Sequence, residues 1–205
     1  MARPRSPGWD DQREQILAAA AHLFATRGFP GTSMNEVAAA CGVSKATLYH
    51  YVRDKQDLLA QITRGHMVLL EALVSDVAAL RLPAERRLPE LITRFMQAYA
   101  SAEDRHRVLT EDVKFLQEPD RSELLAAERR VTSAFADAIA ARRPDLKAAH
   151  LAKPLAMLLF GMINWTFTWL KAGGALSHES LAPVVIALLE GGLPAVRLPE
   201  TADVG

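Results

Sequence analysis

The segment 33–52 contains two short amphipathic helical runs separated by a glycine turn, and it restricts the possible folds more than any other feature. Ser33 and Glu36 have the spacing of a capping box, which predicts a helix start. An apolar stripe follows and ends at Gly42, and Ser44 can cap the second run. Two such helices joined by a glycine-containing turn predict a helix-turn-helix, with the second helix exposed.

Helical periodicity extends over the rest of the chain, and no segment predicts a strand. An amphipathic run between Asp11 and Gly28 precedes the motif, and a run that Asp54 can cap continues towards Leu80. Later helices are predicted at 85–102, 105–116, 120–142, 147–171 and 178–190, with breaks at Pro119, Pro144 and the Gly173-Gly174 pair. The sequence therefore predicts an all-α fold.

The second helix of the motif has one side that needs no core contact and is free to enter a major groove. Lysine and histidine on that side can donate to guanine, while alanine and threonine methyl groups can meet a thymine methyl. Hydroxyl and ammonium groups nearby suit phosphate oxygens. The predicted DNA-binding residues are Thr32, Ser33, Ser44, Lys45, Ala46, Thr47, Tyr49, His50, Tyr51 and Lys55.

Alternatives stay open for several of these residues. Tyr49 and Tyr51 can instead pack between helices, and Lys45 can be a solvated surface charge. Arg3 and Arg5 in the N-terminal arm can add minor-groove or backbone contacts.

Charge and composition set limits on the type of protein. Basic and acidic residues each total 24, so bulk charge does not predict nucleic-acid binding, and DNA affinity must come from local placement. The chain has a single cysteine, Cys41, which excludes an intrachain disulfide and favours a reducing compartment. We interpret Cys41 as a small buried residue rather than a redox switch or metal ligand. No secretory signal opens the sequence, so we predict a cytoplasmic protein.

The uncharged stretch 154–170 is shorter than the roughly 20 apolar residues that span a membrane. It is interpreted as a buried interface helix, and no membrane partner is predicted. The sequence has no G-x-S-x-G elbow, H-E-x-x-H pair or phosphate-binding glycine loop, and its six histidines are dispersed. We therefore predict no enzyme activity, metal or cofactor. A protein that only binds other proteins is a second alternative, and the helix-turn-helix argues against it.

A strong resemblance to the DNA-binding domain of TetR-family repressors covers roughly residues 13–59. It is carried by the helix ILAAAAHLFATRGF and by the stretch TSMNEVAAACGVSKATLYHYVRDKQDLL that begins at Thr32. In that family an LYxHFxxK segment contacts the operator. Leu48, Tyr49 and Lys55 match that segment, whereas position 51 is tyrosine instead of histidine.

The resemblance implies a homodimer that binds palindromic double-stranded operator DNA and responds to a small molecule. The predicted parts are a flexible arm at 1–10, a three-helix DNA-binding domain at 11–57, a ligand-binding and dimerisation domain at 58–195, and a tail at 196–205. The helix that begins after Asp54 joins head to body and is the expected lever between ligand and DNA.

The predicted helix 147–171 is apolar nearly all round, so it must be covered on most sides. As in TetR-like proteins, a four-helix interface with helix 178–190 and a second subunit would cover it; packing within a monomer is the alternative. The predicted interface residues are Leu155, Leu158, Met162, Trp169, Leu181, Val184, Val185 and Leu188.

Aromatic side chains and a few polar groups in the body predict a ligand pocket, although core packing is the commoner role for any single aromatic side chain. The predicted ligand-binding residues are Phe95, Tyr99, His106, Phe115, Phe160, Asn164, Trp165, Phe167 and Thr168. The run from Phe160 to Lys171 also resembles repressors that answer to acyl-CoA thioesters, which implies a hydrophobic acyl-CoA effector. Candidate cations for the CoA phosphates are Arg94, Arg105, Arg107 and Lys171. A lipophilic drug sensed by an efflux-pump regulator is the alternative effector.

Overall fold

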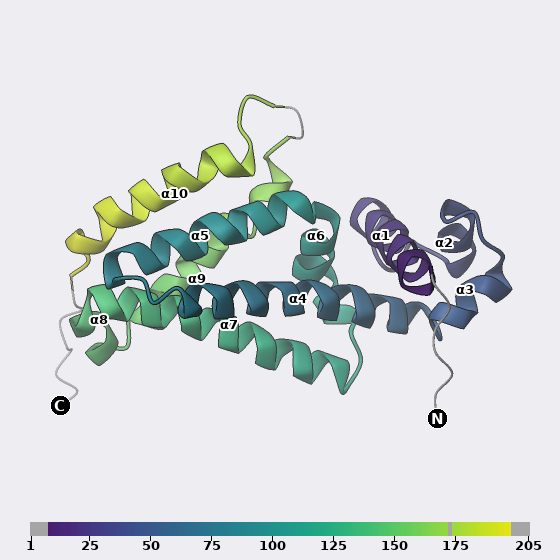
Figure 1. Ribbon diagram of the computed structural model, residues 1–205, viewed down its shortest axis with the longest axis horizontal. Coiled ribbons are helices and arrows are strands. Elements are labelled where there is room, and N and C mark those ends of the chain that lie inside the picture. The colour runs from purple at the N-terminus through teal and green to yellow at the C-terminus, as the bar shows by residue number, and fades with distance from the viewer. Residues whose placement is uncertain (1–7, 172–173, 198–205) are drawn as a thin grey trace, which may run out of the picture. The chain divides into compact units, whose positions relative to one another are not determined.

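A computed structural model describes residues 8–171 and 174–197 (Figure 1). The chain divides into two compact units. The first unit comprises residues 1–69 and 102–126, and the second comprises 70–101 and 127–205. The described residues are helical and contain no strand, so the all-α prediction is confirmed. Most of the predicted N-terminal arm, with Arg3 and Arg5, and most of the predicted tail lie outside the described residues.

The first unit contains the predicted three-helix head together with residues from later in the chain. Its elements are α1 (Trp9–Arg27), α2 (Met34–Ala40), α3 (Lys45–Tyr51), the first part of α4 (Lys55–Ala79), α6 (Glu103–Asp112), the 3₁₀ turn η1 (Val113–Phe115) and the start of α7 (Asp120–Arg142). The face of α1 predicted to be apolar is buried, with Ile16, Ala20 and Phe24 each at most 1% exposed. Because α6 packs against α1, the compact unit is larger than the predicted head at 11–57.

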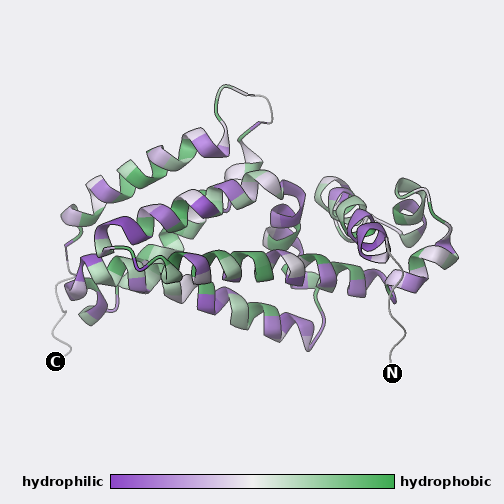
Figure 2. Ribbon diagram, in the orientation of Figure 1, coloured by the Kyte–Doolittle hydropathy of each residue, from purple (hydrophilic) through white to green (hydrophobic). Residues whose placement is uncertain are grey.

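The second unit contains the remaining helices. Its elements are the end of α4, α5 (Ala84–Ser101), the rest of α7, α8 (Pro144–Ala148), α9 (Ala152–Ile163), η2 (Thr166–Thr168), α10 (His178–Gly192) and η3 (Leu193–Ala195). Figure 2 shows polar and apolar residues alternating along α5 and α10, as amphipathic helices do. The two helices pack against each other, while Val184 and Leu188 of α10 stay exposed.

The prediction of one helix over 147–171 is wrong, because α8, α9 and η2 divide this segment. His150 adopts a left-handed φ of 57° between α8 and α9. After α9 ends, the Thr166 hydroxyl donates to the Ile163 carbonyl and the Thr168 hydroxyl donates to the Trp165 carbonyl. These local bonds compete with helical hydrogen bonding and favour a 3₁₀ turn.

The predicted helix 105–116 likewise ends in a 3₁₀ turn. Across the residues that the structure describes, none of the helices is both long enough and apolar enough to span a bilayer.

Candidate nucleic-acid interface

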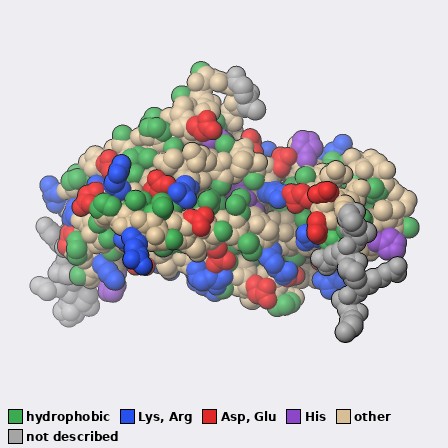
Figure 3. Space-filling view, viewed as in Figure 1, with side chains coloured by type: hydrophobic (Ala, Val, Ile, Leu, Met, Phe, Trp, Pro, Cys, Tyr) green, Lys and Arg blue, Asp and Glu red, His purple; other side chains and the backbone are tan. Residues whose placement is uncertain are grey.

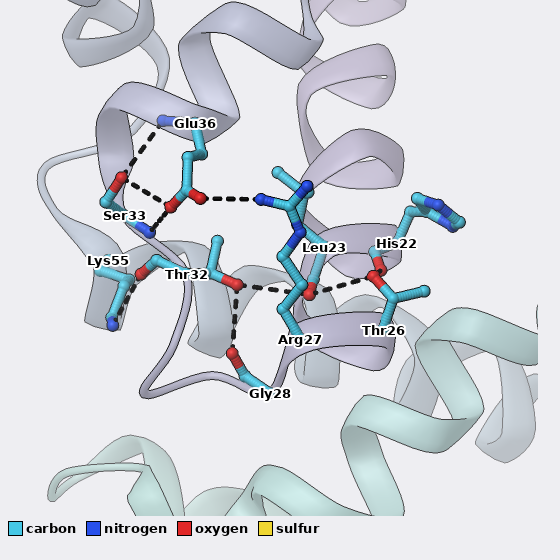
Figure 4. Close-up of polar contacts among 9 residues, drawn as sticks. All are labelled: His22, Leu23, Thr26, Arg27, Gly28, Thr32, Ser33, Glu36 and Lys55. Atoms are coloured by element: carbon cyan, nitrogen blue, oxygen red, sulfur yellow. Dashed lines mark hydrogen bonds and ion pairs between the residues drawn. The ribbon is translucent and has the colours of Figure 1, made fainter.

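The start of α2 is fixed by the predicted capping box, which the structure confirms (Figure 4). The Ser33 hydroxyl accepts a 3.3 Å hydrogen bond from the Glu36 amide, and the Glu36 carboxylate accepts a 2.8 Å bond from the Ser33 amide. The same carboxylate binds the Arg27 guanidinium of α1 at 2.7 Å. The backbone hydrogen bond from Ser33 is the main cause that lowers the pKa of Glu36, so this anion persists near neutral pH.

The turn between α2 and α3 depends on Gly42. Its φ of +64° lies in the left-handed region, where a side chain would be strained. The turn is closed by a 3.1 Å bond from the Val43 amide to the Ala38 carbonyl. Ser44 then caps α3 by accepting a 3.0 Å bond from the Thr47 amide, and the two hydroxyls lie 2.8 Å apart. Both predicted cap residues therefore begin their helices as expected.

The side chains of α3 divide into one buried residue and an exposed face. Leu48 is fully buried and anchors the helix. Lys45, Ala46 and His50 are exposed, and the aromatic side chain of Tyr49 is 44% exposed. This face offers an ammonium, an imidazole, a phenol and a methyl group, which are groups that read base edges or phosphates.

Three further predicted contact residues lie against other parts of the head. The Thr32 side chain is buried, and its hydroxyl donates to the carbonyls of Leu23 and Gly28 (Figure 4). The Lys55 ammonium donates to three backbone carbonyls of the turn between α1 and α2. The half-buried ring of Tyr51 lies 5.2 Å from that of Trp9. These three residues therefore hold the helices of the head in place.

The side of the protein seen in Figure 3 has mixed charge rather than a strongly basic surface. On the face viewed in Figure 3, blue and red side chains are interspersed. This agrees with the zero net charge of the sequence.

An apolar face is exposed on α9, on the residues that flank η2, and on α10 of the second unit. Its members are Met157, Leu158, Trp165, Trp169, Val184 and Leu188, each more than half exposed. Four of the predicted interface residues belong to this face. Leu155 and Met162 are half-buried, whereas Leu181 and Val185 are buried within the chain's own second unit and so lie behind the face.

A cluster of buried aromatic side chains lies in the interior of the second unit. The Phe135 ring lies 4.8 Å from Phe95 and 4.7 Å from Phe160, and Phe95 lies 6.0 Å from Tyr99. The Tyr99 hydroxyl donates a 2.8 Å hydrogen bond to the Asn164 side-chain oxygen. Burial raises the pKa of Tyr99, so its phenol stays protonated and keeps this donor.

The other predicted ligand residues have different positions. Trp165 and Thr168 are exposed, and Phe167 is buried with its ring 6.0 Å from that of Trp165. His106 and Phe115 belong to the first unit. The structure therefore brings together Phe95, Tyr99, Phe160 and Asn164 of the predicted set.

Sequence reasoning missed several buried residues near these groups. Phe135 joins the aromatic cluster, and the apolar period of α7 could have indicated it. His66 lies 5.6 Å from His106, ring to ring, and the His178 ring lies 3.2 Å from the Thr166 hydroxyl. A lone histidine in an apolar run gives no sequence signal for such a partner.

The candidate cations of the predicted phosphate site are paired with carboxylates. Arg94 binds Glu90 and Arg107 binds Glu111, each one helical turn away, and Arg105 binds Glu14. Lys171 is exposed.

A capped helix-turn-helix whose second helix is exposed, followed by a further helical unit, is typical of DNA-binding regulators. The family described as "Bacterial regulatory proteins, tetR family" matches residues 16–62, and "Tetracyclin repressor-like, C-terminal domain" matches residues 81–193. The chain belongs to the TetR family and is a DNA-binding transcriptional regulator rather than an enzyme.

Three relatives illustrate the similarity. A TetR-family regulator from Bordetella parapertussis 12822 is 34% identical, with a TM-score of 0.86 over 92% of this chain and 99% of that one. AibR in complex with isovaleryl coenzyme A and operator DNA is 26% identical, with a TM-score of 0.74 over 86% and 97% of the two chains. The repressor KstR2 of Rhodococcus jostii is 25% identical over 91% of this chain and 93% of its own.

Proposed function

We propose that this protein is a homodimeric, cytoplasmic repressor that binds a palindromic operator through α3 and is released by a hydrophobic acyl-CoA thioester. The observation that carries the DNA-binding site is the division of α3 into a buried anchor at Leu48 and an exposed face at Lys45, Ala46, Tyr49 and His50. In this proposal Ser44 and Thr47, at the start of α3, and Ser33, at the start of α2, approach the phosphates. Thr32, Tyr51 and Lys55 position the head through their contacts within the protein.

The exposed apolar face on α9, α10 and the residues that flank η2 supports the dimer. Six large apolar side chains, each more than half exposed, are costly to leave in water, because burial stabilises by about 25 cal/mol per Å². A second copy of the same face would cover them through an isologous contact. Two heads could then engage half-sites about one helical turn of DNA apart, which compensates for a head of nearly neutral charge.

The aromatic cluster of the second unit supports a hydrophobic effector. Its apolar rings suit an acyl chain, and the Tyr99–Asn164 pair supplies polar groups at one end of the cluster. AibR, whose structure contains isovaleryl coenzyme A and operator DNA, makes a CoA thioester the first candidate.

The CoA phosphates would need cations, and Arg94, which belongs to the same unit as the aromatic cluster, is half-buried in a pair with Glu90 of its own helix. Such pairs contribute only about 0–1 kcal/mol, so a phosphate can replace the carboxylate at little cost. A ligand releases DNA only if it prefers a dimer whose recognition helices are misplaced. Because α4 contributes residues to both units, it is the proposed lever.

The DNA-binding proposal is tested with Tyr49→Ala and the matched control Tyr49→Phe. Fluorescence anisotropy on a duplex from the gene's own upstream region should show binding by wild type and loss of binding by Tyr49→Ala. Dimer mass and ligand affinity should be unchanged, because the side chain is exposed. Wild-type affinity in the alanine variant would contradict the site assignment, and unfolding of that variant would show a structural role.

The effector proposal is tested on the same DNA complex. Isovaleryl-CoA and longer acyl-CoAs should dissociate it, whereas free CoA should not. The proposal would be contradicted if calorimetry showed no binding of any acyl-CoA while a lipophilic drug released the DNA. The effector would then be a drug of the kind that efflux-pump regulators sense.

A further inference from the structure

The turn that joins α1 to α2 is held from several directions, all within the first unit. This turn, residues 28–32, has no helix of its own, so its backbone groups need partners elsewhere. Lys55 of α4 donates to the carbonyls of Phe29, Pro30 and Thr32 at 2.8, 3.4 and 2.9 Å. The position of the turn therefore depends on a side chain from outside α1 and α2.

Two further partners of the turn come from α6 and η1. The backbone amide of Phe29 donates to the carboxylate of Asp112, the last residue of α6. The Phe29 ring stacks on Phe115 of η1, with centroids 5.5 Å apart and planes inclined by 24°. Phe29 is thus bound through both its backbone and its ring by residues far along the sequence.

The remaining contacts of Phe29 close the site around it. Its ring makes an edge contact with Phe24 of α1 at 5.2 Å, and the Lys55 ammonium lies 4.4 Å above it. The side chain is 6% exposed. A Cβ at Gly31 would come within 2.7 Å of the Arg27 carbonyl, so the turn is also tightly closed on α1. Since α2 begins at Met34, a shift of this turn would move the start of α2.

Burial of the Asp112 carboxylate costs free energy, which its hydrogen bond to the Phe29 amide offsets. Burial, with a smaller contribution from Glu111, raises the pKa of Asp112 to about 6. A carboxyl group at the end of a helix would be more stable in solvent, where it would also avoid the negative end of the helix dipole. Its burial against the turn therefore points to a role in holding Phe29.

We propose that Asp112 and Phe115 are positioning residues for operator binding, which act by holding Phe29 and so fix α2 and α3 relative to α1. Both lie outside the segment that matches the DNA-binding family, residues 16–62. They do not touch DNA; they set the placement of the helices that do. The inference depends on operator binding by the head and is independent of the effector.

A double-mutant cycle on operator affinity tests this inference. The probe is a duplex recovered by in vitro selection with the wild-type protein, so wild-type binding is established first; failure to recover any duplex would refute operator binding itself. Phe115→Leu should weaken binding about tenfold in the wild-type background and less than about twofold in the Phe29→Leu background. Equal fold-changes in both backgrounds would show that Phe115 does not act through Phe29.

Asp112 supplies a second, independent measurement. Asp112→Asn keeps an acceptor oxygen and should retain wild-type affinity, whereas Asp112→Ala removes the acceptor and should weaken binding about tenfold. Leu116→Ala, a buried neighbour of Phe115, is the control for a general loss of packing and should leave affinity within about twofold. Circular dichroism and a cooperative unfolding transition verify each variant's fold. Wild-type affinity in folded Asp112→Ala would overturn the role of Asp112.

Discussion

Substitution of His66 should change the pH dependence of stability in a defined way. The residue lies on α4, is 1% exposed, and has its ring 5.6 Å from that of His106. Burial, followed by repulsion from Arg105, lowers the pKa of His66 from 6.5 to about 4. The folded state therefore favours neutral imidazole. Its contribution to stability is complete above pH 6.5 and is lost as pH falls towards 4.

The magnitude follows from proton linkage at about 1.36 kcal/mol per pKa unit. Relative to pH 7.5, the His66 contribution should fall by about 1.4 kcal/mol at pH 5.5 and by about 2.5 kcal/mol at pH 4.5. Asp112 acts in the opposite direction, because its raised pKa of about 6 means that acidification from pH 6 towards 4 stabilises the folded state. The wild-type profile alone therefore underestimates the effect of His66.

The difference between wild type and His66→Asn isolates the group, because asparagine does not titrate. Urea unfolding at pH 7.5, 5.5 and 4.5, at matched protein concentration, gives this difference. The stability advantage of wild type should shrink by about 2.5 kcal/mol between pH 7.5 and 4.5. A difference that stays constant with pH would refute the reasoning, since a packing effect does not titrate.

Four further substitutions test the other parts of the structure. Lys45→Ala should lower the slope of log operator affinity against log salt concentration by about one, the loss of one phosphate contact. An unchanged slope in anisotropy titrations would place the ammonium away from DNA. Leu158→Arg puts a charge on the exposed apolar face and should give a folded monomer in sedimentation, so a persisting dimer would locate the interface elsewhere. Leu48→Ala should cost about 2–5 kcal/mol in urea unfolding, and a loss below 1 kcal/mol would contradict its role as anchor. Tyr99→Phe removes the donor to Asn164 and should lower the free energy of unfolding by about 1–2 kcal/mol. Equal urea midpoints for the variant and wild type would contradict this expectation.

Local signals predicted most of the fold. The capping serines at 33 and 44 and the left-handed glycine at 42 define their elements through contacts only a few residues apart, so the sequence pattern contains the whole interaction. Periodicity likewise located α7, whose observed bounds agree with the prediction. It failed over 147–171, because an apolar run looks the same whether it continues as a helix or turns at Asn164.

The candidate site was predictable only where its residues share one helix. The exposed face of α3 follows from helical spacing, and its side chains are exposed as that spacing requires. The placement of Lys55 against the turn at Phe29, and of Asp112 and Phe115 beside it, depends on how distant segments pack. A hydroxyl or ammonium in a DNA-binding motif can bind phosphate or backbone carbonyls equally well, and only the tertiary fold distinguishes the two.

The contact between Trp9 and Tyr51 makes the protein suitable for intrinsic fluorescence. Of its three tryptophans, Trp9 lies against the end of α3, while Trp165 and Trp169 are half-exposed in the second unit. Emission from Trp9 should report events at the recognition helix, and emission from the other two should shift to shorter wavelength as subunits associate. Replacing Trp9 by phenylalanine would separate the two signals and allow both steps to be followed without an added dye.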